Sequence, residues 1–143
     1  MRVLIDSSVW IDHLRGARTR ETAILGTLFA SLAPELDRSV DEAPADLLIG
    51  DLALCEVLRG IPDPREYAVV RDVLLSFEVV TLGGPDLALE AADHYRALRR
   101  LGVTVRKTID LLIGTYCIAK DCALLHTDRD FDPMTRHLGL RSL

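Results

Sequence analysis

Cysteine is scarce in this chain of 143 residues, which contains Cys55, Cys117 and Cys122 and no others. An odd number of cysteines without a CxxC pair excludes a disulfide framework and argues against a structural zinc site. We expect them to be small core residues in the reducing cytoplasm. Aromatic residues are also few, at 5%. The single tryptophan, Trp10, is expected to pack in the core.

Long apolar runs are missing as well. The chain passes from its first two residues straight into a strand-like segment, without the apolar centre of a signal peptide. No later segment reaches the ~20 uncharged residues that a membrane helix needs. We therefore expect a soluble cytoplasmic protein without a membrane partner.

Positive charge is in deficit. The chain has 17 Lys and Arg against 22 Asp and Glu, which gives a net charge of -5 at pH 7 and an isoelectric point near 5.3. This balance excludes binding of nucleic acid through bulk positive charge. It does not exclude a nuclease that holds phosphates through metal ions, because the ligands of such ions are themselves acidic.

Apolar side chains are abundant enough for a sizeable core. They make up 49% of the sequence, and a chain of this length buries roughly two thirds of its unfolded surface. Internal repeats, linkers and low-complexity segments are absent from the sequence. We expect one domain over residues 1–143.

Short apolar runs alternate with amphipathic helical patterns along the chain. Strands are expected at 2–5, 47–49, 78–82 and 123–126, with an edge strand at 140–143. Helices are expected at 9–14, 21–32, 52–58, 65–77, 86–101 and 109–119, with a short one from 132. Residues 34–46 are acidic and typical of a solvated connection. The alternation predicts an α/β fold, with a parallel sheet of four to five strands covered by helices on both faces.

The segment 106–119 (RKTIDLLIGTYCIA) contains the most apolar helical pattern of the chain and has Asp110 in its first turn. A buried carboxylate must be solvated at one end, paired or bound to a cation, because an unpaired buried charge is costly. The simpler interpretation is a helix-start aspartate, which the helix dipole stabilises by about 0.3–1 kcal/mol.

Acidic residues also follow three of the expected strands. Asp6 follows the first strand, Glu56 lies in the helix after the second, and Asp128 and Asp130 follow the fourth. These strands can be neighbours in a doubly wound sheet, whose ligand crevice lies beyond the carboxyl ends of its strands. Carboxylates gathered there repel one another and require cations. Oxygen ligands without a His/Cys cluster favour Mg²⁺ or Mn²⁺, which activate water for phosphodiester hydrolysis.

Each of these polar residues also has a simpler, non-catalytic interpretation. Glu56 can be an exposed glutamate paired with Arg59 one turn later, and an ordinary turn accounts for two aspartates after the fourth strand. Ser8 either hydrogen-bonds Asp6 or a bound water, or only caps the first helix. A basic group after residue 95 offers a phosphate contact, or is only a solvated helix end. It consists of Arg96, Arg99, Arg100, Arg106 and Lys107.

Four segments resemble the motifs of PIN-domain ribonucleases, and in particular those of the VapC toxins of bacterial VapBC toxin–antitoxin pairs. They are VLIDSSVWIDHLRG (3–16), LCEVLRG (54–60), RKTIDLLIGT (106–115) and LHTDRDF (125–131). The resemblance covers the whole chain and implies a three-layer PIN-like fold. It further implies a type II toxin, a Mg²⁺- or Mn²⁺-dependent endoribonuclease that cuts tRNA, rRNA or mRNA. Such toxins are usually homodimers, and a cognate VapB antitoxin covers the active site and alone contacts operator DNA.

By position, the resemblance implies that the catalytic acids are Asp6, Glu56, Asp110 and Asp128. The expected metal ligands among them are Asp6, Asp110 and Asp128, with Asp130 as the alternative to Asp128. Ser8 and Thr127 match small polar positions that line the site. The chain departs from the common pattern at His126-Thr127, where an asparagine often precedes the aspartate, and in the length of the acidic connection 34–46.

Two other functions share some of these features. A Mg²⁺ phosphatase that forms an aspartyl phosphate also begins with a strand ending in aspartate, but Ser8 stands where its second aspartate is usual. A non-catalytic PIN-like binding module would use the acidic pocket only to receive an arginine from a partner. The binding module keeps its function when Asp110 becomes asparagine, whereas a nuclease loses cleavage.

Overall fold

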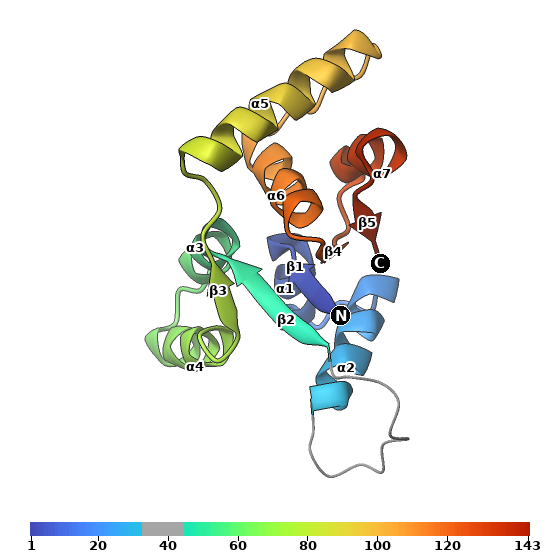
Figure 1. Ribbon diagram of the computed structural model, residues 1–143. Helices are drawn as coiled ribbons and strands as arrows, with labels where there is room; N and C mark the ends of the chain where they lie inside the picture. Colours follow the sequence, from blue (N-terminus) through green and yellow to red (C-terminus); the bar gives the residue numbers. More distant parts are fainter. Residues whose placement is uncertain (33–44) are drawn as a thin grey trace.

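A computed structural model of the protein describes residues 1–32 and 45–143 (Figure 1). Within these ranges five parallel strands form one sheet in the order β3-β2-β1-β4-β5. They are β1 (Arg2–Ile5), β2 (Asp46–Gly50), β3 (Glu78–Val80), β4 (Ala123–Leu125) and β5 (Arg141–Ser142). The expected parallel sheet is confirmed, and so is the neighbourhood of the first, second and fourth strands. Positions 34–44 of the expected acidic connection lie outside the described residues.

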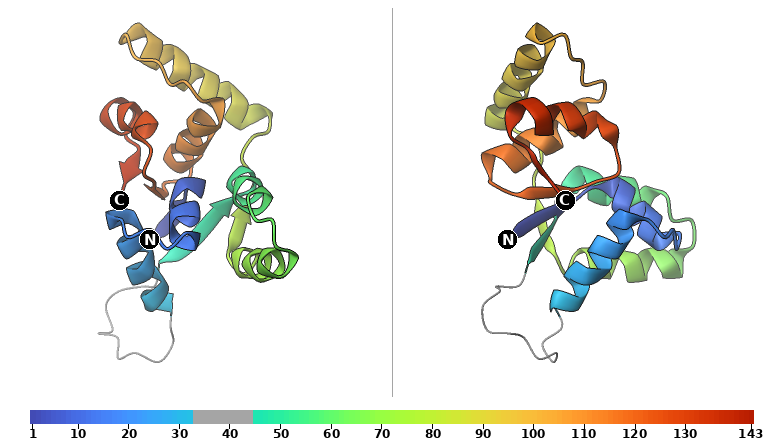
Figure 2. Two further views of the ribbon diagram at one scale, coloured as in Figure 1. Left: turned by 180° about the vertical axis from the view of Figure 1, so that it is seen from behind. Right: turned by 90° about the vertical axis from the view of Figure 1, so that its right-hand side faces the viewer.

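Helices cover both faces of the sheet, which gives three layers (Figure 2). One face carries α1 (Ser7–Leu14), α2 (Arg20–Leu32), α3 (Asp51–Arg59) and α4 (Pro64–Leu74). The other carries α5 (Pro85–Arg100), α6 (Thr108–Ala119), the 3₁₀ turn η1 (Arg129–Phe131) and α7 (Asp132–Leu138). Strand alternation divides the core between the faces, because Val3 and Ile5 pack against the first group and Leu4 against the second.

Helix α6 is buried on nearly every side, as its apolar sequence predicts. Gly114 permits the close approach of α7, because a Cβ atom at this position would lie 2.5 Å from the Met134 sulfur. The Met134 side chain of α7 therefore packs directly on α6, and Asp110 lies in the first turn of this helix.

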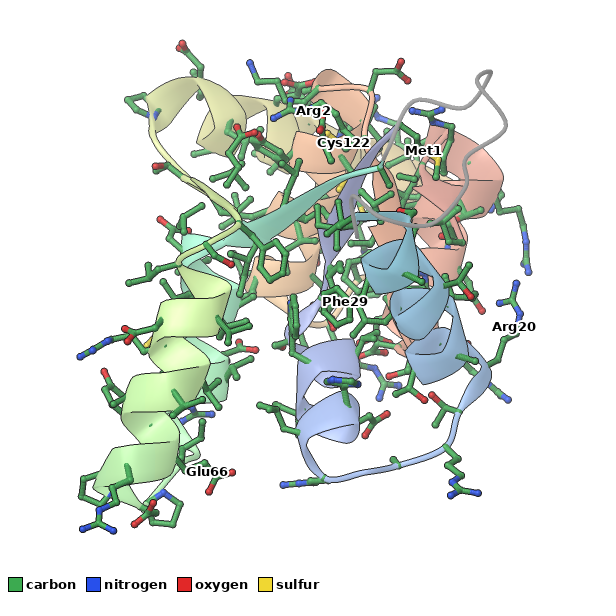
Figure 3. The ribbon with its side chains drawn as sticks, turned by 90° about the horizontal axis from the view of Figure 1, so that it is seen from below. Met1, Arg2, Arg20, Phe29, Glu66 and Cys122 are labelled. Carbon is green, nitrogen blue, oxygen red and sulfur yellow. The ribbon has the colours of Figure 1, made fainter. Side chains whose placement is uncertain are left out.

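Trp10 lies in the core, as expected, with 3% of its surface exposed. Its ring packs against Phe29 of α2 and Phe77, with centroids 5.8 and 5.6 Å away. Figure 3 shows Phe29 pointing from α2 into the interior. This cluster joins α1 to α2 and to the segment before β3.

Several details differ from the sequence predictions. Helix α4 ends at Leu74 and β3 at Val80, both earlier than expected. Cys117 and Cys122 are buried as predicted, but the prediction of a buried Cys55 is wrong.

Helix α3 turns Ala53 and Val57 to the core and leaves Cys55 on its outer side. Asp51 Oδ1 accepts hydrogen bonds from the backbone N–H groups of Leu52 and Leu82. These bonds fix the rotation of the helix and turn Cys55 to solvent.

Among the described residues, no helix is both long and apolar enough to cross a membrane.

Candidate active site

The candidate site lies at β1, the point in the sheet where the strand order reverses. Strand β1 has β2 on one side and β4 on the other, and the crossovers to these two neighbours run on opposite faces. A crevice opens at such a point beyond the carboxyl ends of the strands. A cleft of about 500 Å³ lies here and is lined by all four expected catalytic acids, Asp6, Glu56, Asp110 and Asp128.

Asp6 follows β1 directly and is 6% exposed. Its Oδ2 accepts hydrogen bonds from Ser8 N at 3.1 Å and Ser8 Oγ at 2.5 Å. The expected bond between these side chains is therefore present, and Asp6, not a serine, caps α1. Burial raises the pKa of Asp6, and the hydrogen bonds from Ser8 oppose that rise.

Glu56 reaches the cleft from the second turn of α3. Its Oε2 accepts a hydrogen bond from Ser7 Oγ at 2.5 Å. Arg59, the alternative partner, lines the same cleft and forms no ion pair or hydrogen bond within the described part of the chain. Ser7 is a site residue that the sequence analysis missed, because a serine after a strand predicts only a cap.

Asp110 is 7% exposed. Its Oδ2 is shielded from solvent and has no hydrogen-bond donor among the described residues. The nearest cation is Lys107, whose Nζ lies 3.7 Å away. Burial raises the pKa of Asp110 to about 6, although the Lys107 charge opposes this. A helix-start role does not account for an oxygen that is buried and accepts no hydrogen bond from the described residues.

Asp128 follows β4 and is held from two sides. Lys107 Nζ donates to its Oδ2 at 2.6 Å, and Asp130 N donates to its Oδ1 at 2.9 Å. The bond from Lys107 lowers the pKa of Asp128. Thr127 N is 3.4 Å from Ser8 Oγ, and the Thr127 residue lines a neighbouring pocket, not the cleft itself.

Three carboxylates are grouped closely enough to share a cation. Ligand oxygens of Asp110, Asp128 and Asp130 all lie within 4.8 Å of one another. Asp6 lines the same cleft without joining this trio. An all-oxygen set suits Mg²⁺ or Mn²⁺, and a cation would satisfy the unpaired Oδ2 of Asp110. The residues present therefore fit a divalent ion.

Lys107 is a second residue whose position the sequence analysis missed. Its position in the sequence suggests that it belongs to the basic group of arginines near the end of α5. Lys107 stands immediately before α6, three residues from Asp110, and this spacing indicates that the two side chains are close. An i, i+3 pair of opposite charges at a helix start lies on one side of the helix.

Comparisons with known proteins agree with this architecture. The chain is 27% identical over 140 residues to VapC ribonuclease Mb1587 of Mycobacterium bovis and to Ribonuclease VapC11 of Mycobacterium tuberculosis. Each alignment covers 98% of this chain and 96% of the relative.

Solved structures share the fold. A chain of VapBC2 from Rickettsia felis, bound to a DNA fragment from its promoter, matches with a TM-score of 0.70 at 15% identity and covers 100% of this chain and 98% of that one. A chain of VapBC-1 from nontypeable Haemophilus influenzae matches with a TM-score of 0.66 at 16% identity and covers 100% and 97%. A family model described as PIN domain matches residues 3–136. The chain therefore belongs to the PIN domain family.

Proposed function

We propose that this protein is a divalent-metal-dependent endoribonuclease and the toxin of a type II toxin–antitoxin pair. The observation that carries the proposal is the carboxylate trio of Asp110, Asp128 and Asp130 in a PIN fold, in which the buried Oδ2 of Asp110 accepts no hydrogen bond from the described residues. The similarity to relatives named VapC ribonucleases supports RNA as the substrate. We further propose that the whole chain, residues 1–143, forms one PIN domain.

Each of the cleft residues has a separate role in the proposed phosphodiester hydrolysis. A Mg²⁺ or Mn²⁺ ion, held by Asp110, Asp128 and Asp130 with Asp6 as a further predicted ligand, supplies Lewis-acid activation of water and of the phosphate. Ser7 holds Glu56 Oε2 and leaves Oε1 to accept the proton of the attacking water. Arg59 has no competing partner among the described residues and is placed to bind a phosphate oxygen of the RNA.

Cleavage of a mixed pool of structured RNA tests this proposal. Purified protein is incubated with Mg²⁺, Mn²⁺ or EDTA, alongside Asp6→Asn and Asp110→Asn. Asp86→Asn, an exposed change in the first turn of α5, is the matched control. We expect metal-dependent cutting by the wild type and the control only. If none of the proteins cleaves any RNA, the binding module is favoured. If the wild type hydrolyses only a small phosphomonoester, in a metal-dependent reaction, the phosphatase is favoured.

A groove beside the cleft suits the antitoxin. Ile11, Leu14, Val57 and Ile61 give it an apolar lining, and Ile11 and Glu56 line both groove and cleft. We propose that a segment of a VapB-type antitoxin lies in this groove and continues over the acids. VapBC complexes among the structural neighbours support a partner of this kind.

A substitution in the groove tests this assignment. Ile61→Asp should abolish neutralisation by the antitoxin and leave RNA cleavage unchanged. Leu89→Asp, on the exposed side of α5, is the matched control because Leu89 is 68% exposed and lies outside the groove. If the antitoxin neutralises Ile61→Asp at the same antitoxin-to-toxin ratio as the wild type, the antitoxin does not bind in this groove.

The remaining assignments are predictions about assembly. We propose a cytoplasmic homodimer that contacts operator DNA only through its antitoxin; one structural neighbour is a DNA-bound VapBC from Salmonella typhimurium. Val69 and Val73, one turn apart on α4 and 64% and 48% exposed, provide apolar surface for a second copy. Sedimentation equilibrium of the purified toxin measures the stoichiometry, and a monomer at every concentration would contradict the dimer.

A further inference from the structure

Lys107 places its ammonium group among the acids to which we assign the metal. Its Nζ donates to Asp128 Oδ2 at 2.6 Å and lies 3.7 Å from Asp110 Oδ2. These residues supply two of the three carboxylates that lie close enough to share a cation. A monovalent cation of the protein itself is therefore bound to two carboxylates that a divalent ion would use.

The ammonium is also free to leave. Lys107 is the residue before α6, and its side chain is 59% exposed on a flexible four-carbon stem. Within the described chain its side chain pairs with Asp128 and Asp110 only. Asp128 stays in place when Lys107 moves, because Asp130 N holds its other oxygen. The exchange of one cation for another thus needs a change of side-chain rotamer and no movement of the sheet.

We propose that Lys107 is an internal competitor of the metal ion, which neutralises the carboxylates in the metal-free protein and leaves Asp128 when the ion binds. The inference rests on the metal-dependent nuclease proposed above. An ammonium that stayed would repel the divalent ion at a distance of a few ångströms, so the two cations exclude each other. Loss of the lysine charge should tighten metal binding by up to about fivefold, the upper end of the scale for a partly exposed ion pair.

Titration of the metal-free protein with Mn²⁺, followed by electron paramagnetic resonance and without RNA, measures this competition. Lys107→Met keeps the apolar stem and removes the charge, so it should bind Mn²⁺ about fivefold more tightly than the wild type. Lys107→Arg keeps the charge and should stay within about twofold of the wild type. Arg106→Met is the matched control, because it removes the neighbouring exposed charge, and it should change affinity by less than about twofold.

A second measurement needs no substitution. The sequence has two lysines, Lys107 and Lys120. In the Nζ spectrum of the protein labelled with ¹⁵N-lysine, addition of Mg²⁺ should shift the Lys107 signal towards that of a solvated ammonium. The Lys120 signal should stay where it is, which provides an internal control.

The outcomes separate the two proposals. Unchanged Mn²⁺ affinity in folded Lys107→Met, or a Lys107 signal that Mg²⁺ does not move while the ion binds, overturns the competition and leaves the nuclease standing. Absence of binding by every protein at millimolar Mn²⁺ overturns the metal-dependent function and the competition with it. Tight binding by Lys107→Met alone supports the competition. If this variant does not fold, the wild-type spectrum decides.

Discussion

Replacement of Asp110 by asparagine should stabilise the metal-free protein while it removes activity. Burial raises the pKa of this carboxyl group from 3.8 to about 6, which means that its charged form costs folding free energy. At 1.36 kcal/mol per pKa unit, a shift of about two units corresponds to roughly 1–3 kcal/mol at pH 7.5. For a chain of this length that gain raises Tm by roughly 3–10 °C.

The stability difference between Asp110→Asn and the wild type should depend on pH. Below about pH 3 the Asp110 carboxyl group is protonated in both the folded and the unfolded chain, so asparagine brings no advantage. As pH rises from about 3 to about 6, the unfolded chain ionises first and the wild type loses stability relative to the variant. Above about pH 7 the difference should be constant.

Urea unfolding in EDTA at pH 4, 5, 6 and 7.5 measures the difference. Asp128→Asn is a control of opposite sign, because Lys107 lowers the pKa of Asp128 and the charged form of that residue stabilises the fold. This variant should lose stability above pH 4. An Asp110→Asn protein that is less stable than the wild type at pH 7.5, or whose gain is the same at every pH, would refute the assignment of a desolvated carboxylate.

Three further changes test other parts of the structure. Gly114→Ala places a methyl group 2.5 Å from the Met134 sulfur and should destabilise the protein by about 1–3 kcal/mol in urea unfolding; an unchanged midpoint would contradict the close contact of α6 and α7. A thiol reagent should modify Cys55 quickly and the other two cysteines only after unfolding, because burial raises their pKa; three fast thiols in the folded protein would contradict the core. Ser7→Ala frees Glu56 and should reduce RNA cleavage while the fold is retained; Ser76→Ala, on an exposed turn, is the control, and equal cleavage by the two variants would remove Ser7 from the site.

Periodicity predicted most of the elements because each has a strong local signal. The apolar helix 109–119 and the β1 strand are buried on both sides, and such runs leave little choice of structure. The rotation of α3 was harder to predict, because Asp51 at its start accepts a hydrogen bond from the backbone N–H of Leu82, which is distant in sequence. Cys55 faces solvent for this reason, although its own pattern favoured the core.

Asp6, Asp110 and Asp128 could be expected at one edge of the sheet because each follows a strand or starts a buried helix. Glu56 lies inside α3, and only the motif resemblance pointed to it. The hydrogen-bond partners Ser7 and Lys107 were not predictable, since their contacts depend on which segments meet in space. Ser7 meets Glu56 across 49 residues and Lys107 meets Asp128 across 21. Neither contact has a periodic signal, and a serine or a lysine at a helix start has an adequate local role.

The insertion of β4 beside β1 has a consequence for synthesis of the protein. Val3 pairs with Ala123, so β4, the strand that precedes Asp128, joins the centre of the sheet only after most of the chain has been made. A nascent chain that ends before residue 123 has Asp6, Glu56 and Asp110 but lacks the acid that follows β4. The cleft that these acids line therefore forms only after the last of the four motifs has been synthesised.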